Sequence, residues 1–184
     1  MVLMLGTGCF LVLVLLSIMS LYQWGHAILA ISSKKSASNQ RSARTTRFLI
    51  LIPAHNEEDG LPETLKSLST IQYPKDLVHI AVIADRCADD TAKVARAGGA
   101  QCLERSEGPG GKGAAMSWAM QVLRNEGTLF DALVIVDADC LADLHLLEAF
   151  DDALAKGHEV QQGYNYLSNP WETPFTRVIA VTSV

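Results

Sequence analysis

Residues 132–139 read ALVIVDAD, a short apolar run that ends in two aspartates, Asp137 and Asp139. Such a run is typical of a buried parallel strand, and side chains two residues apart in a strand project to the same side. The two carboxylates are therefore expected side by side where the strand leaves the sheet. A hard divalent cation relieves their repulsion, and Mg²⁺ typically takes one or two carboxylates and completes its shell with substrate phosphates. Solvated acids at a capped strand end are the alternative interpretation.

Two similar strands precede this one. The stretch RFLILIPAHNEE contains an apolar run that stops at Pro53, and LVHIAVIAD ends at Asp85. Segments with helical periodicity follow each strand, and a weaker strand, AQCLE, lies between. This alternation predicts an α/β fold with a mostly parallel sheet flanked by helices, in which ligands bind beyond the carboxyl ends of the strands. The residues expected at that edge are Asn56, Glu57, Asp85, Asp137 and Asp139.

The stretch EGPGGKGAA, residues 107–115, is similar to two phosphate-binding motifs, and neither fits in full. A P-loop needs Ser or Thr after its Lys, where this chain has Gly113. A dinucleotide fingerprint must follow the first apolar strand, which here carries no glycine. A less specific interpretation is that the glycine backbone and the start of the next helix bind an anion beside Lys112. A flexible loop without a ligand is the alternative.

The first 33 residues contain no Asp, Glu, Lys or Arg, and basic residues without acids follow from Lys34 to Arg47. About 20 apolar residues span a bilayer core. Residues 1–31 are therefore predicted to form one transmembrane helix, residues 32–46 a flexible basic linker, and residues 47–184 the globular domain. The positive-inside rule then predicts a single-pass membrane protein with its domain in the cytoplasm. A secretory signal peptide, which has a basic start and a shorter apolar core, and a buried core helix are the alternatives.

All 20 acidic residues lie from Glu57 onward, against 10 basic residues in the same region. A domain with this charge repels nucleic acid, which is therefore not expected as a partner. It would bind a polyphosphate only through local lysines, helix N-termini or a divalent metal. The four cysteines form no C-x-x-C pair and have no His at ligand spacing. This pattern argues against a zinc site and a disulfide framework, and reduced thiols are expected.

Taken in order, the motifs LILIPAHNEE, IADRCADDT, GGKG and VDAD resemble the nucleotide-binding half of a family 2 glycosyltransferase with the GT-A fold. The resemblance is closest to membrane-bound, polysaccharide-synthase-like members, and it covers residues 47–165. It implies that Asp137 and Asp139 bind Mg²⁺ or Mn²⁺, with Asp139 as the direct ligand. It also implies that the ends of the first two strands hold the nucleobase and ribose. The nucleotide-binding residues implied are Pro53, Ala54, His55, Glu57, Asp85, Lys112 and Asp137.

The resemblance also implies a reaction, the inverting, metal-assisted transfer of a sugar from a nucleotide-diphosphate sugar to a glycan or lipid acceptor. A UDP-sugar is the expected donor. No catalytic residue is predicted within the chain, because the general base and the acceptor half are expected beyond Val184, and the fold is expected to be incomplete. The alternatives are a truncated, non-catalytic, membrane-anchored nucleotide-binding module and a nucleotidyltransferase. The last is expected to carry a glycine-rich loop after its first strand, where this chain has PAHNEE.

Neighbouring residues have simpler interpretations. The imidazole of His55 is expected to form a planar wall beside the base, because a nucleobase pocket is the wrong place for a general base. Arg86 and Cys87 are expected to face solvent. Asp89 or Asp90 is expected to cap the helix that follows them.

Overall fold

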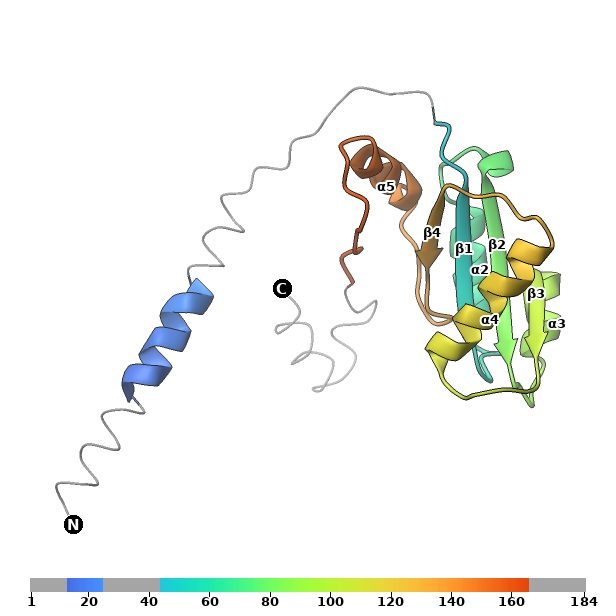
Figure 1. Ribbon diagram of the computed structural model, residues 1–184, viewed down its shortest axis with the longest axis horizontal. Coiled ribbons are helices and arrows are strands. Elements are labelled where there is room, and N and C mark those ends of the chain that lie inside the picture. The colour runs from blue at the N-terminus through green and yellow to red at the C-terminus, as the bar shows by residue number, and fades with distance from the viewer. Residues whose placement is uncertain (1–12, 25–43, 166–184) are drawn as a thin grey trace, which may run out of the picture. The chain divides into compact units, whose positions relative to one another are not determined.

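The computed structural model describes residues 13–24 and 44–165. The chain divides into two compact units, Met1–Gln40 and Arg41–Val184, each of which is described by itself. In the first unit, residues 13–24 form a helix with exposed side chains, drawn in blue in Figure 1. Among the described helices, none combines the length and the apolar composition that crossing a membrane requires. Residues 1–12 and 25–31 of the predicted transmembrane segment lie outside the described residues.

The second unit is built on a four-stranded sheet in the order β3-β2-β1-β4. Every neighbouring pair in this sheet is parallel, with Phe48 opposite Val78 on one side and Ala132 on the other. The predicted parallel α/β architecture is therefore confirmed for the described residues. The strands are β1 (Phe48–Ala54), β2 (Val78–Asp85), β3 (Gln101–Arg105) and β4 (Ala132–Ile135).

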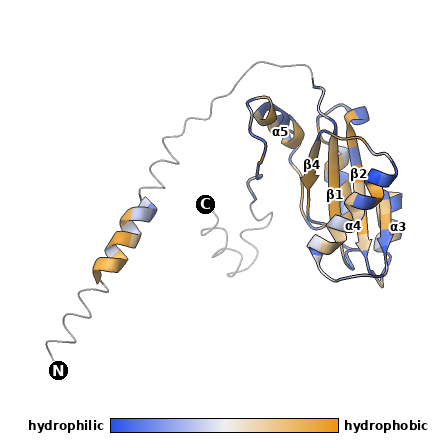
Figure 2. Ribbon diagram, viewed as in Figure 1, coloured by the Kyte–Doolittle hydropathy of each residue, from blue (hydrophilic) through white to orange (hydrophobic). Residues whose placement is uncertain are grey.

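Helices cover both faces of the sheet, with α4 on one face and α2 and α3 on the other (Figure 1). The strands are the most hydrophobic segments of this unit, as Figure 2 shows. A sheet buried on both faces requires this composition, because successive side chains of a strand point alternately into the two halves of the core. The helices are α2 (Leu61–Ser69), α3 (Thr91–Ala97), α4 (Lys112–Asn125) and α5 (Leu146–Leu154), with a short 3₁₀ helix, η1 (Lys75–Leu77).

The core has two halves, one on each side of β1. Phe48, Ile50 and Ile52 point toward α2 and the buried side of α5, whereas Leu49 and Leu51 point toward α4. All five side chains are almost fully buried, and burying each one contributes about 1.5–3 kcal/mol. The alternation explains why this strand reads as an unbroken apolar run in the sequence.

The helix facing the larger half of the core follows the predicted pattern. Leu61, Leu65 and Leu68 of α2 are all buried, as their spacing along one helical face predicts. Pro62 lies in the first turn, where a missing backbone N–H costs no intrahelical hydrogen bond.

Strand β4 is shorter than the apolar run from which it was predicted. It ends at Ile135, and the backbone N–H of Val136 still donates to Leu51 before the chain turns. Leu133 and Ile135 are 40% and 48% exposed, whereas Val134 between them is 8% exposed, so one face of this edge strand is largely uncovered by the described residues. The aspartate pair therefore lies in the turn after the strand rather than on the strand itself.

Part of the predicted basic linker belongs to the folded unit. Arg44 forms ion pairs with Asp152 at 2.5 Å and Asp151 at 3.2 Å, and the Thr46 hydroxyl donates to Asp151 at 2.5 Å. These contacts join the segment before β1 to α5. Since the charge of Arg44 is paired with these carboxylates, the linker presents less free positive charge than its composition predicts.

Candidate functional site

The residues predicted to bind a nucleotide gather at the carboxyl edge of the sheet. Because all four strands are parallel, their last residues and the loops that follow lie along one edge (Figure 1). Pro53 and Ala54 close β1, and Asp85 closes β2. His55 and Glu57 lie in the loop after β1, Lys112 opens α4, and Asp137 and Asp139 follow β4. The structure thus places all the predicted site residues at this edge, and the roles assigned to them stay predictions.

The loop after β1 is joined to the end of β2 by direct hydrogen bonds. His55 Nδ1 lies 2.7 Å from the Asp85 carbonyl oxygen, which can only accept, so Nδ1 is the donor in this bond. Asn56, with a φ of 58°, accepts a hydrogen bond from the Ala88 backbone N–H at 2.7 Å. These bonds hold the exposed imidazole of His55 next to Asp85.

A second set of bonds joins the same two loops further along. The Glu57 backbone N–H donates to the Thr91 hydroxyl at 2.8 Å, and that hydroxyl donates to Asp89 at 2.5 Å. Asp89 also accepts from the Thr91 backbone N–H at 3.1 Å, so Asp89 supplies the predicted cap. Asp90 occupies the N-cap position without a capping side-chain bond.

The Asp85 carboxylate binds two arginines. Arg105 Nη1 lies 2.7 Å from one oxygen and Arg86 Nη2 lies 2.9 Å from the other. Burial by itself would raise the pKa of Asp85, but hydrogen bonds and charges from Arg86 and Arg105 outweigh it, so the pKa lies below its ordinary value. Arg86 is exposed, as expected, and its guanidinium is at the same time paired with Asp85.

Cys87 is less exposed than predicted. Its thiol is half-buried and donates to the Ala54 carbonyl oxygen at 3.6 Å. The backbone N–H of Asn56 contacts the same sulfur at 3.4 Å. Cys87 therefore helps to join the two loops instead of facing solvent.

Arg105 is a functional candidate that the sequence pattern did not indicate. Its side chain is 3% exposed, and its Nη2 donates to the Pro109 carbonyl oxygen of the glycine loop at 2.6 Å. One guanidinium thus contacts both Asp85 and the loop. The one available signal was its position, as an arginine at the carboxyl end of a predicted strand directly before that loop.

The glycine loop leads into α4, which begins at Lys112. Gly111 takes a φ of 101° at the N-cap, a conformation that residues other than glycine rarely adopt. The Lys112 ammonium forms an ion pair with Asp137, and both side chains are about half exposed. The structure therefore brings together the predicted phosphate-binding lysine and one of the two predicted metal ligands.

The turn that carries the aspartate pair is held against α2. The buried hydroxyl of Thr64 donates to the Ala138 carbonyl oxygen at 2.7 Å. A Cβ atom on Gly60 would lie 3.5 Å from that oxygen, 3.5 Å from Glu57 Oε2 and 3.7 Å from Asp139 Cα. These are ordinary van der Waals distances, so the backbone at Gly60 packs against the turn without a steric need for glycine.

The side chain of Asp139 is exposed, and its carboxylate accepts a hydrogen bond from the Cys140 thiol at 3.8 Å. Burial and the charges of Asp139 and Asp137 raise the pKa of that thiol, so it stays a neutral donor. Within the described residues, no group of three or more His, Cys, Asp or Glu side chains could hold a metal ion. Two exposed carboxylates suit a divalent cation whose shell is completed by substrate phosphates, and they do not form a metal-binding cage.

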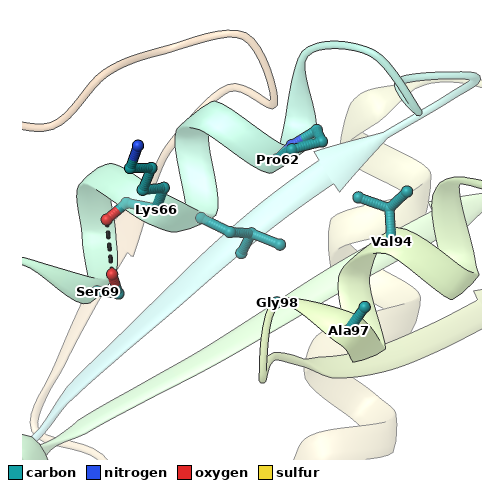
Figure 3. Close-up of a pocket in the computed structure, with 7 residues that line it drawn as sticks. Pro62, Lys66, Ser69, Val94, Ala97 and Gly98 are labelled. Carbon is teal, nitrogen blue, oxygen red and sulfur yellow. Dashed lines mark hydrogen bonds between the residues drawn. The ribbon is translucent and has the colours of Figure 1, made fainter.

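A cavity lies away from this edge, between α2 and α3, and has a volume of about 440 Å³. Figure 3 shows Pro62, Val94 and Ala97 lining it, with Lys66 and Ser69 at one side. The Ser69 hydroxyl is bound to the Lys66 carbonyl oxygen at 2.7 Å. This cavity shares no residue with the predicted site, and it carries no carboxylate.

A parallel sheet with a glycine loop and an acidic turn at its carboxyl edge defines an α/β unit of the kind that binds ligands at that edge. The chain belongs to a glycosyltransferase family, because the sequence model described as "Glycosyltransferase like family 2" matches residues 46–179. The predicted family membership is therefore confirmed.

Individual relatives agree with this assignment. The chain is 33% identical to 4,4'-diaponeurosporenoate glycosyltransferase of Staphylococcus haemolyticus over 144 residues, which cover 74% of this chain and 37% of the relative. A Pyrobaculum calidifontis mannosyltransferase solved with GDP-Man and Mn²⁺ matches 71% of this chain and 38% of its own, at 19% identity and a TM-score of 0.51. TarS 1–349 of S. aureus, solved with UDP-GlcNAc, matches 61% of this chain and 32% of its own, at 21% identity and a TM-score of 0.52.

At these identities the two solved structures show a shared fold alone. The chain spans well under half of the length of each of these three proteins.

Proposed function

We propose that the carboxyl edge of the sheet binds the nucleoside diphosphate of a sugar donor, in an enzyme that transfers the sugar to a glycan or lipid acceptor. The observation that carries this proposal is the ion pair between Lys112 and Asp137 at the carboxyl edge of the sheet, in the turn that also carries Asp139. Family membership supports it, as do the nucleotide sugars bound by the two solved structures. A uridine diphosphate sugar is the proposed donor, and inversion at the anomeric carbon is the proposed outcome.

Each residue at the edge has a proposed task. His55 and Asp85 would hold the nucleobase and ribose, with Pro53, Ala54 and Glu57 forming the adjacent wall. Lys112 would leave Asp137 and place its charge on the diphosphate, because charge on the departing group grows in the transition state. Mg²⁺ or Mn²⁺ held by Asp139 and Asp137 would supply Lewis-acid stabilisation of the same leaving group.

Binding of UDP to the full chain in detergent tests this function. We expect saturable binding of UDP in the presence of Mn²⁺, and loss of affinity when a chelator removes the metal. Lys112→Ala should weaken UDP binding by about 1.5–3 kcal/mol, the usual range for a hydrogen bond to a charged group. Arg124→Ala, which removes a cation from the other end of α4, should leave the affinity unchanged. UDP binding that no chelator alters would show that the proposed metal role is wrong.

We also propose that residues 1–31 anchor the protein in a membrane, with the domain on the cytoplasmic side. The support is the absence of charge through residue 33, the basic residues that follow, and the exposed apolar side chains of residues 13–24. A reporter that is active only outside the cytoplasm, fused after Arg47, should stay inactive. Cleavage of the chain before Ser32, with release of a soluble product, would contradict the anchor.

A further inference from the structure

Arg105 occupies a position where one side chain contacts two parts of the candidate site. Its guanidinium donates to Asp85 Oδ1 at 2.7 Å and to the Pro109 carbonyl oxygen at 2.6 Å. The side chain is 3% exposed, and burying a guanidinium is unfavourable unless its donors are paired. Both hydrogen bonds therefore stabilise the buried conformation of the Arg105 side chain.

We propose that Arg105 is a positioning residue that fixes the glycine loop, residues 106–111, and through it Lys112, relative to Asp85. Within residues 44–165, its bond to Pro109 is the one hydrogen bond that residues 106–110 make with another part of the protein. The loop is otherwise held by its two ends, at β3 and α4. Without Arg105, the loop that leads to Lys112 would be held by those two ends alone.

The neighbouring arginine, Arg86, lies beside Gly110 of the loop but makes no hydrogen bond to residues 106–110 within the described part of the chain. Arg86 binds the second oxygen of Asp85 at 2.9 Å, and its side chain is 37% exposed. Asp85 therefore keeps a cationic partner when Arg105 is replaced, whereas the Pro109 carbonyl loses its donor. The hydrogen bond to the loop therefore belongs to Arg105 alone of the two arginines. Replacing Arg105 tests the position of the loop while Arg86 still neutralises Asp85.

The loop side of the contact depends on a glycine. A Cβ atom on Gly108 would lie 2.8 Å from Arg105 Nη2, closer than real Cβ contacts allow. Gly108 also has a φ of 99°. The same contact can thus be disturbed from the loop by Gly108→Ala without removing the buried arginine. Gly127→Ala is the matched control, since Gly127 has a φ of 75° and its Cβ would meet nothing within 4 Å.

Limited proteolysis of the full chain with a glutamate-specific protease tests the loop directly, without a ligand. Glu107 lies in the loop, and Glu63 lies in α2, where cleavage reports unfolding of the whole unit. Arg105→Gln and Gly108→Ala should each speed cleavage after Glu107 by about tenfold or more, the effect of losing a hydrogen bond to a charged group. Cleavage after Glu63 should change less, and Gly127→Ala should not speed cleavage after Glu107. Equal acceleration at Glu107 and Glu63 in both variants would overturn the proposal, because Arg105 would then be a merely structural residue.

The second readout is coupling to Lys112, and it rests on the proposed UDP site. If Arg105 acts through the loop, Lys112→Ala should weaken UDP binding less in the Arg105→Gln background than in the parent chain. Strictly additive losses would contradict this coupling. If the parent chain fails to bind UDP with Mn²⁺, the proposed function is wrong, while cleavage after Glu107 still decides whether Arg105 fixes the loop.

Discussion

Asp139→Asn is expected to abolish the metal-dependent part of UDP binding. Asp137 is engaged by Lys112, whereas the contact of the Asp139 carboxylate is a neutral thiol at 3.8 Å. Asp139 is therefore the carboxylate more available to Mg²⁺ or Mn²⁺. Asparagine keeps the size of the side chain and removes its charge, and hard divalent cations are bound mainly through charged oxygen ligands.

Titration of UDP with and without Mn²⁺ measures this effect. In the Asp139→Asn variant the two binding curves should coincide. Asp76→Asn is the control, because it also removes one negative charge but lies in η1, between α2 and the start of β2. An Asp139→Asn variant that still gains affinity from Mn²⁺ would show that another residue holds the metal.

Asp85→Ala is expected to destabilise the folded unit by about 3 kcal/mol, the lower end of the range for breaking a buried ion pair. The guanidinium of Arg105, which is 3% exposed, would be left without its carboxylate. It would keep the Pro109 carbonyl as one partner, which is why the lower end applies. Urea unfolding of the full chain, followed by circular dichroism, measures the free energy of unfolding.

Asp131→Ala is the matched control for this measurement. Asp131 and Arg47 also form a close ion pair, at 2.7 Å, but their side chains are 44% and 43% exposed. Solvent screens such a pair, so its loss should cost far less than the loss of Asp85. Equal costs for the two substitutions would mean that the Asp85 pair is not buried in solution.

The stabilisation from Asp85 should also depend on pH in a defined direction. Its pKa in the folded state lies below the ordinary value of 3.8, so the folded state holds the proton less tightly than the unfolded chain. The stabilisation is therefore complete above the unfolded-state pKa and is lost as the pH falls through the lower, folded-state pKa. The parent chain should lose this contribution in acid, and Asp85→Ala should lack that loss.

The sequence was sufficient to predict the sheet and the edge at which the site lies. Strands such as β1 are buried on both faces, and this appears in the sequence as continuous apolar runs. The rule that ligands bind beyond the carboxyl ends of parallel strands then brought Asp85, Lys112 and Asp137 to one edge. The close contact of Lys112 with Asp137 agrees with that expectation.

The partners of individual charges could not be predicted in the same way. Asp85 and Arg105 lie 20 positions apart, and Arg44 lies 108 positions from Asp152. Neither pair follows from local periodicity, because ion pairs depend on which loops the sheet brings together. The length of β4 was overestimated for a related reason, since an apolar run does not show where pairing with a neighbouring strand stops.

The strand order has a consequence for the rate and sequence of folding. Strand β1 pairs with β2 about 30 positions later in the chain and with β4 about 84 positions later. Closing a longer loop costs more entropy, and contacts between distant residues slow folding. The β1–β2–β3 part is therefore expected to assemble first, with the Asp85 network already formed. Docking of β4 comes later, so the acidic turn after it is expected to be the last part of the edge to reach its native position.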